Sequence, residues 1–469
     1  MTLALPNTHI GPKQIGEILS RAGGVYFIGI GGVSMSCLAE MSLSLGLRVG
    51  GSDRTPSVIT EHLESCGIRV DYGHDASHVE GYGAVVFTLA IDAQNPELAA
   101  AKEKGIPSIS RADYLGYLMS AYVSRIGVSG MHGKSTTTAM LAQIFSEASK
   151  HPTVVSGAAL SQSEGCYRAG GKESFIYEAC EYMDSFLCFC PTVQIILNVE
   201  LDHTDYFADI HAVCRSFEAA LERLPKNGYA ILNADDALTS SLACDAKVIT
   251  FGIQNDATVT AKNIQNEGGY YAFDLVSNGE SLTRITLAIP GYHNIYNALA
   301  ASAASLQAGI LPEDIRTALA VFRGAARRME YHGTLDGVEI YEDYAHHPTE
   351  IRAALNAARD MKKGRLFCVF QSHTYSRTAE LFDGFIDALS LADHALILPI
   401  YAARETDTRG VSGEKMALAL QKRGVSADHA ESFAAAADLI RAHTVEKDMV
   451  IVMGAGDVFH VLHELGISK

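Results

Sequence analysis

The chain has 469 residues, 48% of them hydrophobic and 19% charged, which is an ordinary globular composition with room for two or three domains. The net charge of −17 argues against a general nucleic-acid-binding or anionic-membrane-binding protein, although a single pocket can still be basic. The longest apolar runs are too short to span a bilayer, so no membrane insertion is predicted.

The opening stretch and the cysteines both predict a cytoplasmic protein. MTLALPNTHIGPKQIGEIL lacks the basic start and the long apolar core of a signal peptide. The nine cysteines are scattered through mostly apolar segments, and only Cys188 and Cys190 form a C-x-C pair. Buried, reduced thiols are therefore expected.

Strand and helix patterns alternate from the start of the chain. Residues 25–31 (VYFIGIG) are predicted as a buried strand, 35–46 as a helix that ends at a glycine, and 48–53 as a second strand. Residues 83–110 repeat the strand–helix–strand order. This rhythm is typical of a parallel sheet with helices on its faces.

A second unit is predicted to begin with the strand SRIGVSG (124–130) and the helix that follows it. Two further apolar runs, SFIYEAC and TVQIILNVE, are predicted strands. Between residues 259 and 290, short alternating runs with turns at NEGG and SNGE indicate an antiparallel insert. Two helices are predicted after it, at 294–309 and 312–322.

A third unit is predicted from about Arg327 onward. It has a hairpin-like run at 333–344, a helix after Pro348, and strands at 365–370 and 448–456. The predicted fold class is therefore α/β with three domains. These domains are expected to cover residues 1–117, 118–325 and 326–469.

The stretch RIGVSGMHGKSTTTAM has the position of a phosphate-binding loop, after an apolar strand and before a helix. The strict pattern G-x-x-x-x-G-K-[ST] fails, because Val128 stands where its first glycine belongs. The N–H groups of residues 130–135 are nevertheless expected to point into one concavity at the positive end of the helix. Lys134 is expected to reach the β- and γ-phosphates, and Ser135 to offer an oxygen to Mg²⁺. A glycine-capped turn with a solvated lysine is the simpler alternative.

A second glycine-rich turn lies upstream, in GIGGVSMSC. Gly29, Gly31 and Gly32 resemble G-x-G-x-x-G, with Ser34 at the last glycine position, and Asp53 ends the next strand. A Rossmann-like unit that binds the diphosphate and ribose of a nucleotide fits this spacing. A dinucleotide-dependent oxidoreductase is the competing interpretation.

Acids and a histidine follow two strands of the second unit. Glu178 comes at the end of one strand, and Glu200, Asp202 and His203 come after another. Each alone is most simply a surface acid or a loop histidine. Next to a phosphate loop, and together with Ser135, they predict a divalent-cation site.

Polar clusters also mark later strand and helix ends. PGYHNIYNALAA places His293, Asn294 and Asn297 at a helix start, where N-capping would account for only one of the asparagines. EDYAHHPTEI and FQSHTYSRT supply further candidates, which are Asp343, Tyr344, His346, His347, His373 and Arg377. Such a density of polar side chains at strand-to-helix turns predicts a binding site.

Six blocks in this order resemble the Mur ligase family of peptidoglycan synthesis over nearly the whole chain: GIGGVSMS, GKSTTT, NVELDHTDYF, PGYHNIYNALAA, EDYAHHPTEI and FQSHTYSRT. That family has a short phosphate loop, G-x-x-G-K-[ST], which Gly130, Gly133, Lys134 and Ser135 match. The resemblance implies an N-terminal Rossmann-like domain for a UDP-sugar, a central ATPase domain and a C-terminal Rossmann-like domain that closes over the site. It also implies ATP-dependent ligation of L-alanine to the lactyl carboxylate of UDP-N-acetylmuramate through an acyl phosphate, with two Mg²⁺ ions.

The resemblance assigns roles to residues of this chain. The expected catalytic residues are Lys134, Glu178, His203 and Arg377. ATP is expected to contact Gly130, His132, Gly133, Lys134, Ser135, Thr136, His293, Asn294, Asn297, Arg327, Asp343 and His346. The UDP-sugar is expected to contact Gly29, Gly31, Gly32, Ser34, Met35 and Asp53. L-Alanine is expected to contact Tyr344, His373 and Arg377, and Mg²⁺ to be held by Ser135, Glu178 and His203.

The sequence departs from the family pattern at several positions. Met131 stands where a threonine is expected, and Ser34 and Cys37 replace glycines after the first strand. Cys180 stands where an aspartate is common, and Ser372 where a proline is common. None of these changes removes a residue that the chemistry requires.

Three alternatives stay open at this point. One is a relative that joins a pre-made peptide to the same UDP-sugar. Another is a nicotinamide-dependent oxidoreductase, which would leave the phosphate loop unexplained. The third is a nucleotide-binding regulator without activity, against which the retention of Lys134, Glu178, His203 and Asp343 argues. The oligomeric state, monomer or homodimer, is left open.

Overall fold

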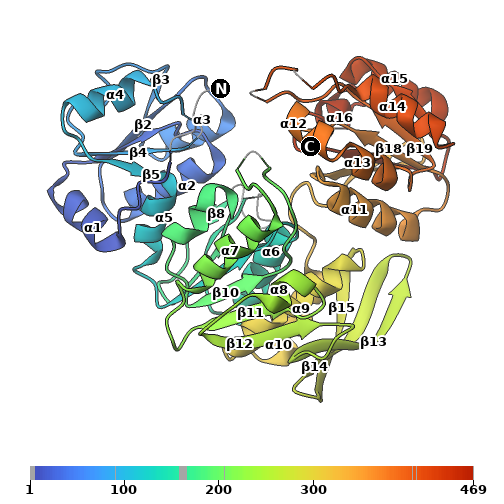
Figure 1. Cartoon of the computed structure of the whole chain (residues 1–469), viewed down its shortest axis with the longest axis horizontal. Coiled ribbons are helices and arrows are strands. Elements are labelled where there is room, and N and C mark those ends of the chain that lie inside the picture. The colour runs from blue at the N-terminus through green and yellow to red at the C-terminus, as the bar shows by residue number, and fades with distance from the viewer. Residues whose placement is uncertain are drawn as a thin grey trace. The chain divides into compact units, whose positions relative to one another are not determined.

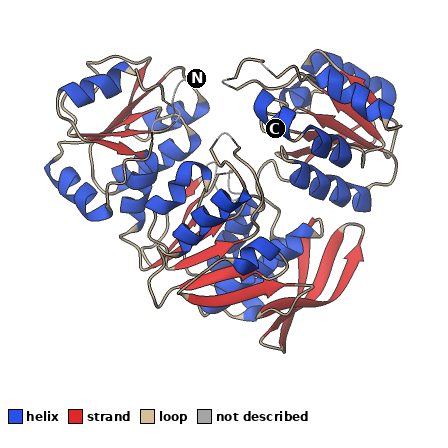
Figure 2. Ribbon diagram, viewed as in Figure 1, coloured by secondary structure: helices blue, strands red, loops and turns tan. Residues whose placement is uncertain are grey.

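The computed structural model describes residues 6–89, 91–157, 166–204, 206–403, 405–407 and 409–467. The chain forms two compact units. The first unit consists of residues 1–259 and 300–314, and the second of residues 260–299 and 315–469. Figure 1 labels the elements of both units, and Figure 2 separates their helices from their strands.

The first unit opens with a five-stranded parallel sheet in the order β3-β2-β1-β4-β5. Its strands are β1 (Val25–Ile28), β2 (Val49–Asp53), β3 (Arg69–Tyr72), β4 (Ala84–Phe87) and β5 (Ser108–Ser110). Its helices are α1 (Pro12–Arg21), α2 (Val33–Ser44), α3 (Val58–Ser65), α4 (Pro96–Glu103) and α5 (Arg111–Met119). Val25 and Phe27 belong to one apolar cluster, and Tyr26 and Ile28 to another. The sheet therefore buries both faces, as an unbroken apolar strand requires.

The second sheet of this unit carries the predicted phosphate loop. Its strands run in the order β12-β11-β10-β6-β9-β7-β8, parallel except for the β7–β8 pair. They are β6 (Ser124–Ser129), β7 (Thr153–Val155), β8 (Tyr167–Arg168), β9 (Ser174–Glu178), β10 (Val193–Ile196), β11 (Tyr229–Asn233) and β12 (Lys247–Gly252). The helices are α6 (Lys134–Glu147), α7 (Ile210–Leu221), α8 (Ala237–Ser241) and the 3₁₀ helix η1 (Tyr182–Cys188).

The second unit begins with the predicted antiparallel insert. Its strands are β13 (Val259–Glu267), β14 (Tyr270–Ser277) and β15 (Glu280–Pro290), of which β14 and β15 pair antiparallel. Gly268, Gly269, Asn278 and Gly279 have positive φ at the turns, as tight hairpins need. The helices α9 (His293–Gln307) and α10 (Pro312–Val321) follow, and residues 300–314 of this stretch belong to the first unit.

The C-terminal sheet has the order β16-β17-β21-β18-β19-β20 and is parallel except for the β16–β17 hairpin. The strands are β16 (Glu330–Leu335), β17 (Val338–Asp343), β18 (Leu366–Phe370), β19 (His394–Ile397), β20 (Ser426–His429) and β21 (Met449–Met453). The helices are α11 (Pro348–Met361), α12 (Tyr375–Glu380), α13 (Phe382–Leu389), α14 (Gly413–Lys422), α15 (Phe433–His443) and α16 (His460–Glu464). Alternate residues of β18 pack in two separate clusters, one with α11, α13 and α14 and the other with α15 and α16. Helices thus cover both faces of the sheet (Figure 2).

The structure confirms the predicted α/β fold class and the type of each element predicted from the sequence. Among the described residues, no helix is both long and apolar enough to cross a membrane. All nine cysteines are free thiols, as expected. The expectation that they are buried holds only for Cys37, Cys188 and Cys368; Cys66 is exposed and the other five are half-buried.

Candidate functional site

The glycines of the phosphate loop hold backbone shapes that other residues avoid. Gly130 leaves β6 with a φ of +128°, and Gly133 precedes α6 with a φ of +85°. A Cβ on Gly130 would also lie 3.0 Å from the Cβ of Leu197 and 3.1 Å from the N of Asn198. Only glycine fits both constraints. The loop therefore delivers the N-terminus of α6, with its unpaired N–H groups, to the end of the sheet.

One expectation for this loop is wrong. Two of the N–H groups from residues 130–135 do not point into a common concavity, because Asn198 takes them. The N–H of Met131 donates to the Asn198 carbonyl at 3.3 Å, and that of His132 donates to the Asn198 Oδ1 at 2.9 Å. The Asn198 amide in turn donates to the His132 carbonyl at 3.0 Å. Asn198 thus holds the loop in place through three hydrogen bonds.

Lys134 lies over the loop and is paired with a buried acid, Glu181. Its Nζ donates to the carbonyls of Gly130 at 2.6 Å and Met131 at 3.2 Å, and to both Glu181 oxygens at 3.2 Å. Burial alone would lower the pKa of Lys134, but the charge of Glu181 raises it above its usual value. The ammonium is therefore held charged and in place.

Glu181 is a buried residue of this site that the sequence analysis did not name. Its side chain is 1% exposed and lies between Lys134 and the His203 Nε2, which is 3.3 Å away. Burial would raise the pKa of Glu181, but Lys134 and His203 together hold it below its usual value. Its only signal in the sequence is its place in EACE, three residues after Glu178.

Glu178 and His203, the predicted metal ligands, come from neighbouring loops. Glu178 ends β9 opposite Val128, and its Oε1 accepts from the Ser156 hydroxyl at 2.8 Å and the Gly157 N–H at 2.6 Å. His203 has a φ of +52° and stacks on Tyr182 with ring centroids 4.6 Å apart. Ser135 and Thr136 are buried in the first turn of α6. Carboxylate and hydroxyl oxygens at a phosphate loop are suitable Mg²⁺ ligands.

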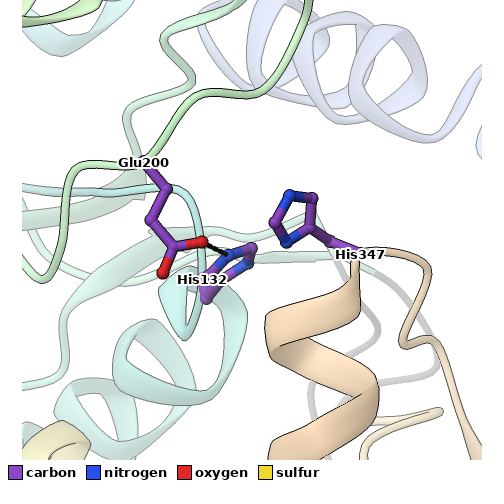
Figure 3. A group of neighbouring side chains, drawn as sticks. All are labelled: His132, Glu200 and His347. Atoms are coloured by element: carbon purple, nitrogen blue, oxygen red, sulfur yellow. Dashed lines mark hydrogen bonds and ion pairs between the residues drawn. The ribbon is translucent and has the colours of Figure 1, made fainter. Parts of the chain in front are cut away.

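The His132 side chain points toward Glu200 (Figure 3). The His132 Nε2 lies 3.2 Å from the Glu200 Oε2, and Figure 3 marks this contact with a dashed line. Both side chains belong to the first unit. A second acid–base pair therefore lies beside the loop, on residues from two predicted motifs.

The upstream glycine turn has the closure that a Rossmann-like unit requires. The Gly31 N–H donates to the Asp53 Oδ2 at 2.8 Å, and Gly29 has a φ of +80°. A Cβ on Gly31 would lie 2.8 Å from both the Asp53 Oδ2 and the Thr60 Cγ2. Gly32 caps α2, with Ser34 in its first turn. Asp53 is thereby fixed at the end of β2, beside the turn.

Met35 and the departures from the family pattern lie in packed surroundings. Met35 is 1% exposed in the core, and its N–H donates to the Gly32 carbonyl. The contact between Met35 and the UDP-sugar stays a prediction. Met131 and Cys37 are also buried. The Ser372 hydroxyl lies 2.6 Å from that of Thr378. Met35, Cys37 and Met131 therefore pack in the core beside the two glycine turns.

In the second unit, the start of α9 is a small buried amide network. The Asn294 Nδ2 donates to the Pro290 carbonyl at 2.6 Å, and the Asn297 Nδ2 donates to the Asn294 Oδ1 at 2.9 Å. Burial lowers the pKa of His293 to about 4, and the charge of Arg328 acts in the same direction. His293 is therefore neutral at physiological pH.

Arg327 and Asp343 shape the start of the C-terminal sheet. The Arg327 guanidinium pairs with Glu342, donates to the Gly454 carbonyl at 3.0 Å, and lies 4.8 Å from the centroid of the Tyr344 ring. Asp343 accepts the N–H groups of Met329 and Ala345, both at 2.8 Å. Burial raises the pKa of Asp343 to about 6 in spite of these donors.

The remaining candidates lie around β18. His346 contacts the Tyr344 carbonyl at 3.0 Å and Glu350 at 3.3 Å, while the His347 side chain caps α11 by accepting the Thr349 N–H. The His373 ring stacks on Tyr401 at 5.5 Å and lies 6.5 Å from the His346 ring. Burial lowers the pKa of His373 to about 4, and nearby Arg377 lowers it further.

The predicted site residues fall into two groups in the first unit and one set in the second unit. The first unit holds the UDP-sugar candidates around Gly31 and Asp53, and the phosphate and metal candidates around Lys134. The second unit holds His293, Asn294 and Asn297 and the residues from Arg327 to Arg377.

Three family models match successive parts of the chain. They are the Mur ligase family catalytic domain over residues 24–123, the Mur ligase middle domain over 128–305, and the Mur ligase glutamate ligase domain over 327–456. Together they cover most of the sequence.

The chain is 44% identical over 439 residues to a UDP-N-acetylmuramate–L-alanine ligase of Clostridium novyi, which covers 93% of this chain and 96% of the relative. The chain belongs to the Mur ligase family. A ligase of the same name from Caldicellulosiruptor saccharolyticus is 42% identical over 92% of this chain and 96% of its own length.

Solved structures agree with this family membership. The crystal structure of the UDP-N-acetylmuramate–alanine ligase MurC from Thermotoga maritima matches with a TM-score of 0.80 and 28% identity, covering 95% of this chain and 100% of that one. The Mur ligase domains confirm the predicted organisation into N-terminal, middle and C-terminal α/β domains. The boundaries at residues 117/118 and 325/326 stay predictions.

Proposed function

We propose that this Mur ligase joins L-alanine to the lactyl carboxylate of UDP-N-acetylmuramate, with conversion of ATP to ADP and phosphate. The observation that carries the proposal is the 44% identity, over 93% of the chain, to a relative named for this reaction. The paired Lys134 and Glu181 at a phosphate loop support it, because the reaction begins by bringing two anions together.

The chemistry needs an activated carboxylate. A carboxylate is a poor electrophile because its leaving group would be oxide. Transfer of the γ-phosphoryl group of ATP to a carboxylate oxygen gives ADP and an acyl phosphate. The amine of alanine then attacks the carbonyl carbon, a C–N bond forms, the C–O bond to phosphate breaks, and a proton leaves the nitrogen.

We assign the first step to the loop. The Lys134 ammonium and the N-terminus of α6 would bind the β- and γ-phosphates and screen them from the incoming carboxylate. Glu181 would keep Lys134 charged and aimed at the loop, from the contact of 3.2 Å between them. Mg²⁺, held by Ser135, Glu178 and His203, would supply further charge neutralisation on the phosphates.

We assign the substrates to the other groups. Asp53 and the turn Gly29–Gly32 would bind the ribose and diphosphate of the UDP-sugar, with Ser34 and Met35 beside them. His293, Asn294 and Asn297 would bind adenine and ribose. Arg377 would pair with the alanine carboxylate, next to Tyr344 and His373. Arg327, Asp343 and His346 would complete the nucleotide site.

We further propose three domains divided at 117/118 and 325/326, and a cytoplasmic location. Nine free thiols support that location, because reduced cysteines are usual in the cytoplasm.

The test measures phosphate release from ATP and Mg²⁺ with UDP-N-acetylmuramate present. L-Alanine, a tripeptide or no amine is added. Release that requires both the sugar and L-alanine is the expected result. Release with the tripeptide but not with alanine would assign the chain to a peptide-adding relative instead. No release under any condition would overturn the proposal.

A further inference from the structure

A cluster in the C-terminal sheet, separate from the residues assigned above, has the composition of a transition-metal site. It consists of His394, Asp428 and His443. One ligand atom from each of these three residues lies within 4.8 Å of the other two. We propose that this cluster binds one divalent transition-metal ion of the zinc type.

The fold brings the three residues together on one face of the sheet. His394 begins β19 opposite Ser426 of the edge strand β20, and Asp428 lies two residues further along β20. Residues two apart in a strand share a face, so Ser426, Asp428 and His394 point the same way. The His394 ring also packs 5.1 Å from the Phe367 ring, in the cluster that α15 covers. His443 is the last residue of α15.

The spacing is close to that of a coordination shell. The His394 Nε2 lies 3.4 Å from the Asp428 Oδ2, and the His443 Nδ1 lies 4.0 Å from the same oxygen. Tetrahedral zinc with ligands at about 2.0–2.1 Å needs about 3.3 Å between ligand atoms. The first distance already fits. The two pairs that involve His443 lie within 4.8 Å, so His443, whose side chain is 45% exposed, needs a side-chain shift of up to about 1.5 Å.

The electrical surroundings favour a cation. His394 and His443 are the only ion-pair partners of Asp428 among the described residues. His443 ends α15, where the helix dipole is negative. Arg365 lies nearby and donates to the His443 carbonyl at 2.8 Å, but Asp448 balances its charge at 2.7 Å.

The cluster also has an outer hydrogen bond of the kind that metal-binding histidines use. The His394 Nδ1 lies 2.9 Å from the Ser426 hydroxyl. With the His394 Nδ1–H donating a hydrogen bond to the Ser426 hydroxyl oxygen, the lone pair of Nε2 is directed at Asp428 and the metal. Two imidazoles and one carboxylate suit zinc, cobalt or nickel better than magnesium, and three ligands leave a position for water.

A second cluster in the same unit, Glu330, His332 and Glu342, offers three ligand atoms at similar spacing. It is a weaker candidate, because the Arg327 guanidinium pairs with Glu342 and the Arg327 N–H donates to Glu330. A metal ion at this cluster would have to compete with the Arg327 guanidinium for Glu342.

The test is calorimetric titration of zinc into the full chain without a purification tag. Wild type is compared with His443→Gln and Asp428→Asn, which change half-exposed side chains, and with His429→Gln as the matched control. His429 is the next residue of β20 but faces the other side, against Gly413 at the start of α14. We expect wild type and the control to bind one more zinc equivalent than the two ligand variants, or to bind it at least about tenfold more tightly.

Equal stoichiometry in all four proteins, with affinities that differ by less than tenfold, would overturn the proposal. Zinc is also expected at the proposed Mg²⁺ ligands Ser135, Glu178 and His203, so the difference between variants is the informative quantity. Cobalt absorption provides a second readout, since visible bands from imidazole ligation should be lost in His443→Gln and kept in His429→Gln. Ser426→Ala should weaken zinc by about tenfold or more, and an unchanged affinity would overturn the part given to Ser426.

Discussion

The buried groups around the phosphate loop keep their charge, whereas two buried histidines of the second unit are neutral. Around the phosphate loop, Lys134 has a raised pKa and Glu181 a lowered one, so both carry charge. In the second unit, burial lowers the pKa of His293 and of His373 to about 4 and raises that of Asp343 to about 6. Paired charges suit phosphate, whereas neutral rings and amides suit adenine, ribose and an amine. The difference teaches that pairing, more than burial, decides whether a buried group keeps its charge.

Removing the Lys134 ammonium should have the largest effect on activity. In Lys134→Ala the β- and γ-phosphates lose their ammonium, and we expect kcat for phosphate release to fall by at least about a thousandfold, or about 4 kcal/mol in the barrier. Lys226→Ala, which changes an exposed lysine of the same unit, is the control and should keep full activity. A Lys134→Ala enzyme within tenfold of wild type would contradict the role given to the loop.

Removing the charge of Glu181, the buried partner of Lys134, should have the next largest effect on activity. Glu181→Gln keeps the shape but takes away the charge that holds Lys134, so kcat should fall by about a hundredfold. Because Glu181 raises the pKa of Lys134, its loss should move the alkaline limb of the rate–pH profile to lower pH. Profiles of wild type and Glu181→Gln measure this shift. An unchanged limb would mean that Glu181 is structural only.

The second unit should respond to acid instead. The folded-state pKa of His293 lies below the unfolded value of about 6.5, so its neutral form contributes stability above that pH. This stability is lost as pH falls toward 4, by about 2 kcal/mol between pH 7.5 and pH 5. Denaturant unfolding of wild type and His293→Gln at the two pH values is the measurement. An equal acid-induced loss in both proteins would remove His293 as the cause.

The smallest expected effects are on KM, and they should differ between substitutions in the two glycine turns. In Gly31→Ala the new Cβ would meet Asp53 and Thr60 at 2.8 Å, so we expect KM for the UDP-sugar to rise about tenfold with little change in KM for ATP. Gly130→Ala should raise KM for ATP with little change in KM for the UDP-sugar, because alanine is strained at a φ of +128° in the proposed phosphate loop. If either substitution changed both KM values alike, the two turns would not have separate substrates.

The elements that were predicted from the sequence were found, because apolar runs bounded by glycine leave few alternatives. Strands such as β3, β11, β12, β19 and β20 were not predicted. VYFI and LFCVF became strands buried on both faces, and Gly133 began α6 as expected. The hairpin turns at Gly268 and Gly279 followed from their residues alone.

Contacts that depend on irregular backbone were not predictable. Whether Glu178 or Glu181 reaches Lys134 depends on η1, where Met183 and Asp184 have positive φ that their residue types do not announce. His203 reaches Glu181 from another positive φ. The use of two loop N–H groups by Asn198 is likewise a pairing between residues 66 or more positions apart, which no local pattern encodes.

The most direct test of the account follows the carboxylate oxygen. UDP-N-acetylmuramate labelled with ¹⁸O in its lactyl carboxylate is incubated with the chain, ATP, Mg²⁺ and L-alanine, and the phosphate and sugar products are analysed by mass spectrometry. An acyl phosphate predicts one ¹⁸O in each phosphate released and a new amide to alanine in the sugar product. Unlabelled phosphate would show that ATP is hydrolysed without activating the carboxylate, and would contradict the central claim.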